Sequence, residues 1–328
     1  MKAWLLDEIG DGIDRLRLAE VPDPAPQASE VVLEVKFAAL NPADRYLAEG
    51  LYPAKPALPH ILGRDGMGVV SQVGLGITDV KAGTKMLLLR GPIGIDRPGM
   101  LAEKCAVPFE SLAPIPEGWS DQESAGAATV LLTAHQAIYH WSDLPQPAVI
   151  LVTGASGGVG FATIELGAAL GHTLIGLSRD AEKSRKLRDL GAAATFDPNN
   201  AQWKKDCKDF LGRRRVDLAV DNVGGNLFND VIDTLGNLGR VSVVGRLAGP
   251  VPNFNTAALI FRRIKIRGVQ VGAYTNAEAR AAWNQIIELL ARRGSKPVVD
   301  SIFPIKKLRD AFERLTVGPM GKVLVKIG

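Results

Sequence analysis

The segment from residue 148 to residue 170 restricts the fold more than any other part of this chain. It runs from the apolar residues 149–153 through a glycine-rich turn into a helical pattern over residues 158–170. A buried strand, a tight glycine turn and a helix, in this order, suit a dinucleotide pyrophosphate, because backbone N–H groups and the helix dipole stabilise its negative charge. The residues predicted to contact such a ligand are Ala155, Ser156, Gly157, Gly158, Val159 and Gly160.

The turn by itself is moderately specific, since Ala155 stands where the strict pattern has its first glycine. Glycine-rich turns of this kind also occur in other α/β folds, so the surrounding pattern decides. Strands are expected at residues 149–153, 173–178, 216–221, 240–244, 266–271 and 323–327, and helices at 158–170, 182–190, 227–235 and 278–291. The alternation predicts an α/β fold with a doubly wound parallel sheet that helices cover on both faces, a Rossmann domain.

The first hundred residues have a different texture. Short β-branched strands are expected at residues 31–37, 68–73 and 85–89, and prolines and glycines separate them. This pattern predicts a compact β-rich, barrel-like module with functional loops. Near Asp121 the texture changes, and the Ala-rich stretch 123–140 predicts one helix that leads into the next domain.

Composition excludes several classes of protein. With 328 residues, 46% of them hydrophobic and 23% charged, the chain is long enough for two domains and is not disordered. A net charge of +4 favours an anionic small molecule but is too weak to indicate nucleic acid. Polar residues or glycine turns interrupt the uncharged stretches, so neither a membrane span nor a signal peptide is expected. Two cysteines are too few for a disulfide framework, and we expect a cytoplasmic protein.

The end of the second Rossmann strand bears on the cofactor. An acidic residue there would accept hydrogen bonds from the adenosine ribose, but this chain has Ser178 followed by Arg179, which suits a 2′-phosphate. Asp180 lies one position later and complicates the assignment, and Arg179 pointing into solvent is the alternative. Lys183 supplies a second cation or is a surface lysine. On balance the residues predict NADPH.

Several ordered motifs resemble a known family. They are residues 41–46 (NPADRY), 50–53 (GLYP), 62–70 (LGRDGMGVV), 155–160, 221–225 (DNVGG) and 321–323 (GKV). Together they resemble the zinc-free quinone oxidoreductase (zeta-crystallin-like) branch of the medium-chain dehydrogenase/reductases, over nearly the whole chain. The resemblance implies a GroES-like catalytic domain at 1–123 and 264–328, with the Rossmann domain at 124–263. It also implies a homodimer joined through the last Rossmann strand, about residues 266–274.

The resemblance also bears on metal binding. Zinc-dependent members carry Cys where this chain has Asn41, and His-Glu where it has Arg64 and Asp65. The two cysteines and four histidines show no ligand spacing, so no metal is expected, and both cysteines are interpreted as core residues. His60 is the only histidine near the expected site, and a catalytic role for it is disfavoured.

In related enzymes the residue aligned with Tyr52 is a proton donor, so the resemblance implies that Tyr52 is an acid or oxyanion donor. It implies that Asn41, Asp44 and Tyr46 line the nicotinamide cleft, although either tyrosine could be a core aromatic instead. Arg64 belongs to the expected substrate pocket, where it binds a substrate carboxylate or, as we favour, pairs with Asp44 or Asp65. Further implied cofactor contacts are Thr133, Asn222, Gly245, Val269, Val271 and Lys322.

The resulting hypothesis is an NADPH-dependent reductase of a quinone or an α,β-unsaturated carbonyl, without nucleic-acid or membrane partners. Hydride addition to such a substrate places negative charge on its oxygen, which a donor or a proton must meet. One alternative in the same fold is a 2-enoyl-thioester reductase. A third hypothesis, of another class, is an NADPH-binding structural or RNA-associated protein without turnover.

Overall fold

The computed structural model describes residues 1–10, 12–250, 252 and 254–328, and the chain divides into two compact units. Unit 1 comprises Met1–Thr129, Tyr274–Ala281 and Lys296–Gly328, and unit 2 comprises Val130–Ala273 and Ala282–Ser295. The division falls inside helices α3 (Ala128–Tyr139) and α9 (Asn276–Arg293). Compared with the domains expected from the sequence, residues 264–273 and 282–295 lie in unit 2, and residues 124–129 lie in unit 1.

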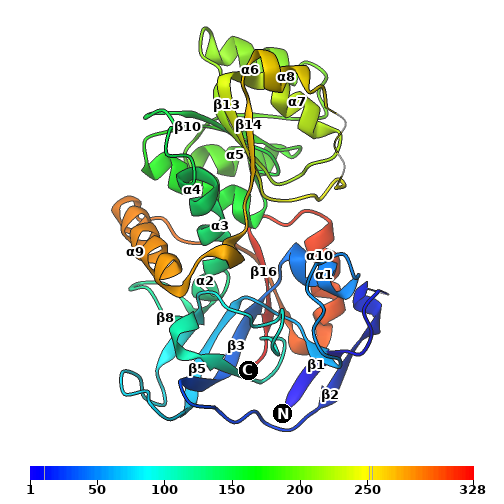
Figure 1. Ribbon diagram of the computed structural model, residues 1–328, viewed down its shortest axis with the longest axis vertical. Coiled ribbons are helices and arrows are strands. Elements are labelled where there is room, and N and C mark those ends of the chain that lie inside the picture. Colours follow the sequence, from blue (N-terminus) through cyan, green and yellow to red (C-terminus); the bar gives the residue numbers. More distant parts are fainter. Residues whose placement is uncertain (11, 251, 253) are drawn as a thin grey trace. The chain divides into compact units, whose positions relative to one another are not determined.

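Unit 2 contains a six-stranded parallel sheet (Figure 1). Its strands are β9 (Val149–Val152), β10 (Thr173–Leu177), β11 (Ala192–Phe196), β12 (Val216–Asp221), β13 (Leu235–Val243) and β14 (Lys265–Gly268). They lie in the order β11-β10-β9-β12-β13-β14. This is the doubly wound order, in which ligands bind at the carboxyl ends of the strands where the order reverses.

Helices cover both faces of this sheet, as its apolar strands require. The helices that follow the strands are α4 (Gly158–Ala169), α5 (Ala181–Asp189), α6 (Trp203–Leu211), α7 (Leu227–Thr234) and α8 (Ala257–Phe261). On one face Leu151 and Ile175 join a core with Trp203 of α6 and Phe228 of α7. The alternate residue Ile150 points to the other face and is also fully buried. The doubly wound prediction is confirmed.

Unit 1 contains two sheets of mostly antiparallel strands. Its strands are β1 (Lys2–Leu6), β2 (Leu16–Glu20), β3 (Glu30–Ala39), β4 (His60–Ile61), β5 (Gly66–Val73), β6 (Lys85–Leu88), β7 (Lys104–Pro108), β8 (Leu112–Pro114), β15 (Val299–Pro304) and β16 (Lys322–Lys326). The larger sheet has the order β15-β16-β3-β5-β6-β8, with β7 also paired to β3, and the smaller one has the order β2-β1-β4. The β-rich prediction is confirmed.

Three helices belong to unit 1: α1 (Pro42–Ala48), α2 (Asp121–Ala125) and α10 (Leu308–Thr316). Leu47 of α1 and Phe312 of α10 are both 0% exposed in the core that the sheets enclose. Strand β16 pairs with β3 through Leu324 and Ala39, so the end of β3 and the start of α1 lie beside the C-terminal strand. This pairing brings residues near 41 and near 322 together.

Two expected elements differ in the structure. The single helix predicted over residues 123–140 is wrong, because α2 ends at Ala125 and α3 begins at Ala128. A Cβ at Gly126 would lie 3.0 Å from the Cβ of Lys322, which is tighter than an ordinary van der Waals contact, so glycine suits this close approach. The strand predicted over 266–271 ends at Gly268, and a short 3-10 helix, Val271–Ala273, follows.

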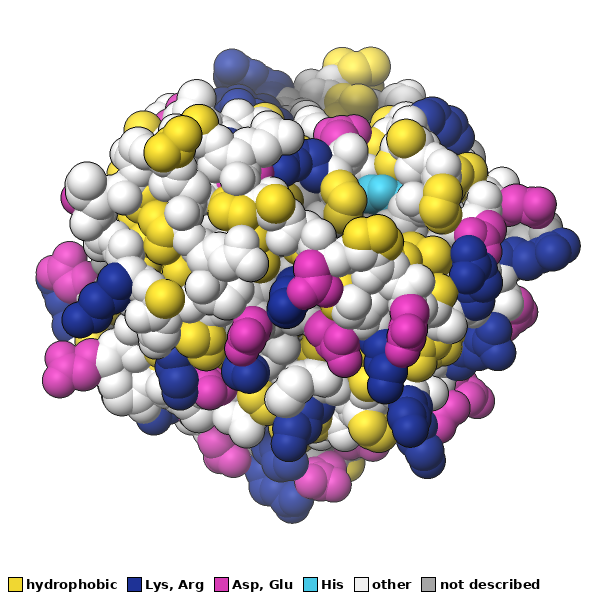
Figure 2. All heavy atoms as spheres, turned by 90° about the horizontal axis from the view of Figure 1, so that it is seen from below, with side chains coloured by type: hydrophobic (Ala, Val, Ile, Leu, Met, Phe, Trp, Pro, Cys, Tyr) yellow, Lys and Arg dark blue, Asp and Glu magenta, His cyan; other side chains and the backbone are white. Residues whose placement is uncertain are grey.

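Among the described residues no helix is long and apolar enough to cross a membrane. On the face that Figure 2 shows, positive and negative side chains are interspersed. That face therefore carries no broad area of one charge sign, such as nucleic-acid binding commonly uses.

Candidate functional site

In unit 1 the N-terminus of α1 carries two of the expected site residues. Asp44 is fully buried, and its Oδ2 accepts a hydrogen bond from the backbone N–H of Asn41 at 2.9 Å. Pro42 occupies the first helical position, where a missing N–H leaves no bond unmade. Since Leu47 anchors the same helix in the core, Asn41 and Asp44 are held in fixed positions.

Arg64 connects Asp44 to Tyr52. Its Nε donates to Asp44 Oδ1 at 3.0 Å, its Nη2 donates to the carbonyl oxygen of Ala43 at 3.0 Å, and its guanidinium carbon lies 4.6 Å from the centre of the Tyr52 ring. The last distance is that of a cation–π contact. Burial acts against the charge of Arg64, but Asp44 and then Tyr52 hold its pKa above the usual range. The expected ion pair is confirmed, with Asp44 as the partner.

A second buried ion pair fixes the other side of Asn41. The ammonium of Lys322 donates to the carbonyl oxygen of Leu40 at 3.0 Å, to Asn41 Oδ1 at 2.8 Å and to Asp65 Oδ2 at 3.1 Å. Burial raises the pKa of Asp65, and Lys322 opposes that rise. All three N–H donors of Lys322 are engaged inside unit 1, so its direct contact with a cofactor stays a prediction. Asp65 was expected as an alternative partner of Arg64, and it pairs with Lys322 instead.

Tyr46 on α1 and Tyr52 after it are both half-buried, and Tyr52 packs against the core of unit 1. His60 is 3% exposed, and burial lowers its pKa. Its Nε2 has no hydrogen-bond partner in the described part of the chain. These hydrogen bonds and the ring contact bring Asn41, Asp44, Tyr52 and Arg64 together in unit 1.

In unit 2 the glycine turn has the geometry that the sequence predicts. Gly157 is the N-cap of α4, and a Cβ there would meet only the carbonyl oxygen of Gly154, at 3.4 Å. The space beside Gly157 is therefore open to a ligand. At Gly160 a Cβ would lie 2.5 Å from the carbonyl oxygen of Ala155, so only glycine lets the helix pack this closely on the turn. Both glycines fit a pyrophosphate cradle.

The loop after β12 is pinned against the end of β9. Asp221 is fully buried, and its carboxylate accepts from the Thr153 hydroxyl at 2.7 Å and from the backbone N–H of Gly224. The side-chain amide of Asn222 donates to the Thr153 carbonyl at 2.8 Å, while its Oδ1 is buried with no hydrogen-bond partner among described residues. A Cβ at Gly245 would lie 2.4 Å from the Asn222 carbonyl, so this loop packs directly on Asn222.

An orphaned amide oxygen at the carboxyl ends of two neighbouring strands fits a ligand that brings a donor. The nicotinamide carboxamide is such a group. Thr153 and Asp221 hold this loop and were not among the expected site residues. Both could have been found in the sequence, because each is a polar residue at the carboxyl end of a buried strand.

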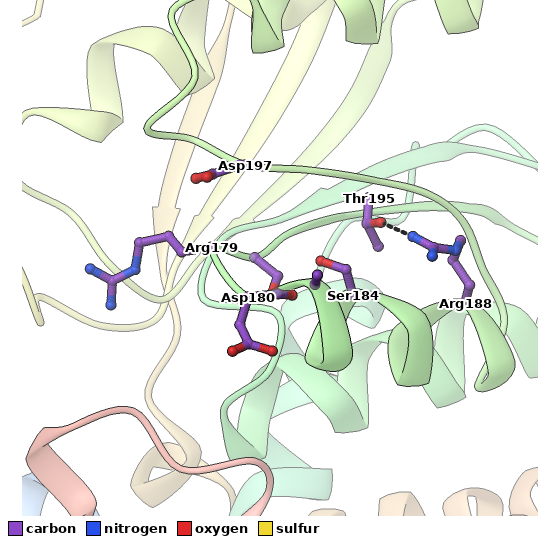
Figure 3. A pocket seen from close by; sticks show the side chains of 8 residues that line it. Arg179, Asp180, Ser184, Arg188, Thr195 and Asp197 are labelled. Atoms are coloured by element: carbon purple, nitrogen blue, oxygen red, sulfur yellow. Dashed lines mark hydrogen bonds between the residues drawn. The ribbon is translucent and has the colours of Figure 1, made fainter.

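A pocket lies at the end of β10 (Figure 3), where the ribose was expected. Its lining includes Ser178, Arg179, Asp180, Arg188, Thr195 and Asp197. Arg179 is exposed and extends away from α5, whereas Arg188 donates to the Thr195 hydroxyl at 2.5 Å. The pocket therefore combines the exposed guanidinium of Arg179 with the buried Ser178, an arrangement that fits a 2′-phosphate.

The two carboxylates of this pocket have local partners. Asp180 caps α5, accepting from the backbone N–H of Lys183 at 2.9 Å, and this bond lowers its pKa. Asp197 accepts from the backbone N–H of Asn199 at 2.9 Å. The carboxylate of Asp180 therefore serves as a helix cap. Asp197 was not predicted as a pocket residue, because β11, which precedes it, was not recognised as a strand in the sequence. Lys183 is half-buried and does not line the pocket.

The remaining expected cofactor contacts are scattered over unit 2. Thr133 is buried in α3 at 9% exposure, and Val269 and Val271 are half-buried after β14. The backbone N–H of Val269 donates to the carbonyl oxygen of Val243 at 2.9 Å, which extends the β13-β14 ladder by one bond. The contact of these three residues with the cofactor stays a prediction.

Cys105 and Cys207 are free and buried, and burial raises the pKa of their thiols to about 12 and about 11. They are core residues, as expected. In the described ranges no three His, Cys, Asp or Glu side chains are grouped so that they could hold a metal ion.

Known proteins resemble this chain throughout. Residues 158–292 match the family model of zinc-binding dehydrogenases, and residues 27–117 match that of the alcohol dehydrogenase GroES-like domain. The quinone oxidoreductase of Rattus norvegicus is 29% identical over 99% of this chain and 97% of its own length. A crystal structure of an NAD-dependent alcohol dehydrogenase superimposes with a TM-score of 0.91, at 26% identity and full coverage of both chains. The Escherichia coli quinone oxidoreductase complexed with NADPH shares the fold, with a TM-score of 0.89 at 24% identity over 100% of both chains.

Proposed function

This chain belongs to the quinone oxidoreductase branch of the medium-chain dehydrogenase/reductase superfamily and is an oxidoreductase, and from that premise we propose that it reduces a quinone or an α,β-unsaturated carbonyl with NADPH. The observation that carries the proposal is the set of buried polar groups around Tyr52 in unit 1, together with the arginine-bearing pocket in unit 2.

The choice of NADPH rests on this chain's own residues, since one similar structure is described as NAD-dependent and another as a complex with NADPH. Ser178 and Arg179 would hold the 2′-phosphate, because no carboxylate at that position repels it and the planar guanidinium suits a phosphate. The turn at Gly157 would hold the pyrophosphate, and Asn222 Oδ1 would accept from the carboxamide. Bound there, the cofactor supplies a hydride.

The residues of unit 1 would supply the rest of the chemistry. Hydride addition leaves negative charge on the substrate, and Tyr52 is placed beside a permanent cation where it can donate its proton. Asn41 and Asp44 would shape the nicotinamide end of the site, since both are held by charged partners. The proton, rather than a metal, would then neutralise the substrate oxygen.

We propose that catalysis uses no zinc. Asn41 and Arg64 replace a thiolate and an imidazole ligand, and Arg64 is a cation that would repel a metal ion. The purified protein should therefore hold substoichiometric zinc by mass spectrometric metal analysis, and a chelator should leave turnover unchanged. One tightly held Zn²⁺ per chain would contradict this.

We also propose a homodimer joined through β14. This strand pairs only with β13, and all four of its residues are exposed. The unpaired N–H and C=O groups of such an edge strand can form hydrogen bonds with a strand of a second chain. Close by in sequence, Ile260 is 70% and Phe261 is 82% exposed, which gives the edge an apolar neighbour that a partner can cover.

The function is tested by following NADPH oxidation with menadione, cinnamaldehyde and crotonyl-CoA. The proposal is supported if kcat/KM for menadione or cinnamaldehyde is more than about tenfold higher than kcat/KM for crotonyl-CoA. Preference for crotonyl-CoA would indicate the enoyl-thioester reductase, and oxidation with none of the three would contradict any of these reductases.

A further inference from the structure

We propose that Arg64 is a positioning residue for Tyr52, holding its ring in one orientation and stabilising the negative charge that the phenol carries after it gives up its proton. This inference rests on the proposed function, because it assigns a role to a residue through the proposed proton donor.

Arg64 is well placed for this role because it is itself immobilised. Asp44 and the carbonyl oxygen of Ala43 each accept a hydrogen bond of 3.0 Å from it, and its side chain is only 9% exposed. These bonds use Nε and Nη2, so they fix the plane of the guanidinium. The position of that plane in turn determines where the Tyr52 ring can pack, at 4.6 Å from the guanidinium carbon.

The electrostatics favour the same conclusion. In the proton transfer the O–H bond of Tyr52 breaks, the proton goes to the substrate anion, and the electron pair stays on the phenolate oxygen. The phenolate charge spreads into the ring, so a cation above the ring attracts the ring more strongly after the transfer than before it. Water then returns a proton to Tyr52. Arg64 would therefore act mainly in the transition state.

A purely structural role explains the arrangement less well. A buried ion pair gains little net stability, because desolvation of both ions offsets their attraction. The Arg64–Asp44 pair would serve stability without any contact to Tyr52, yet the guanidinium stacks on that ring. The Arg64–Asp44 pair carries no net charge as a whole, but its positive member is the one that lies over the Tyr52 ring.

The test is a double-mutant cycle on kcat with cinnamaldehyde. Arg64→Met should lower kcat about tenfold while KM changes less than about threefold, and in a Tyr52→Phe background it should change kcat less than about twofold. Arg64→Lys keeps the charge but loses the planar face, so it should recover part of kcat and most of the melting temperature. Arg45→Met is the matched control, since Arg45 on α1 pairs with Glu49 and should leave kcat unchanged.

A spectroscopic measurement keeps the proposal independent of turnover. With fluorotyrosine incorporated, fluorine NMR should give one narrow line for Tyr52, identified by its loss in Tyr52→Phe. That line should shift and broaden in Arg64→Met, or in Arg64→Lys if the first variant does not fold, but not in Arg45→Met. An unchanged line, or equal kcat losses in both tyrosine backgrounds, would overturn the proposal, whereas inactivity of the wild type on every substrate would overturn only the proposed function.

Discussion

At the scale of single residues, Tyr52 differs from an ordinary core aromatic. It is half-buried, and one face of its ring packs on a guanidinium that a buried carboxylate holds in place. Tyr52→Phe keeps the ring and removes only the donor. We expect it to lower kcat with cinnamaldehyde by about 10²–10³, with little change in KM, because the lost interaction forms in the transition state. Steady-state kinetics check this, and a loss below about threefold would reduce Tyr52 to packing.

Cofactor preference also belongs to this scale. A charge-assisted hydrogen bond from Arg179 to a 2′-phosphate is worth about 1.5–3 kcal/mol, which corresponds to a preference for NADPH over NADH of roughly 10–100-fold. Arg179→Ala should remove most of that preference in kcat/KM at fixed ionic strength. Arg185→Ala, on the adjacent helix α5 and outside the pocket, should retain it. A wild type that prefers NADH would point instead to Asp197.

From the sequence we could predict which residues meet at the site only where they lie close together in one motif region. Asn41, Asp44 and Tyr52 share one motif region, and their cluster was expected. The pairing of Lys322 with Asp65 joins residues 257 positions apart, and it follows from the β16-β3 register, which no local pattern reveals. Asp197 was missed for a similar reason, because it reaches the pocket only through a strand that went unrecognised.

At the scale of elements, helix α4 contains a buried acid. Glu165 is 2% exposed, and burial raises its pKa to about 8, while Arg293 opposes the rise. Because the unfolded chain titrates near 4.5, the folded chain binds more protons between 4.5 and about 8. The resulting stabilisation is complete below that window and is lost as the pH rises through it.

Thermal unfolding of Glu165→Gln tests this sign. Wild type should lose stability with rising pH at up to about 1.4 kcal/mol per pH unit, and the glutamine variant should show a flatter profile. Glu182→Gln, at an exposed position of α5, should keep the wild-type slope. A wild-type profile that rises with pH over this window would contradict the assignment.

Several regular elements of unit 2 were predictable, because strands such as β9 and β10 are apolar runs followed by a helix pattern. The break between α2 and α3 was not, since it lies where Gly126 closely approaches Lys322, nearly 200 positions away in sequence. Helix α6 carries lysines and aspartates around a narrow apolar stripe, and its single buried face escaped recognition.

At the scale of the whole molecule, the prediction concerns assembly. Phe261→Glu places a charge at an 82% exposed apolar position shortly before β14 in the sequence, so it should raise the dimer dissociation constant at least about tenfold. Sedimentation velocity over a range of concentrations measures this. Leu75→Glu, at an 83% exposed site in unit 1, should leave the dissociation constant unchanged. A wild type that sediments as a monomer at every concentration would contradict the dimer.

The division of the chain into two units has an evolutionary consequence. The groups that would distinguish one dinucleotide from another lie in unit 2, at Ser178, Arg179 and Asp197, whereas Tyr52 and Arg64 lie in unit 1. Substitutions in one set leave the packing of the other untouched. A lineage with this architecture can therefore change the dinucleotide that supplies its hydride while the proton-donating residues stay the same. It can equally change its substrate while it keeps the same dinucleotide.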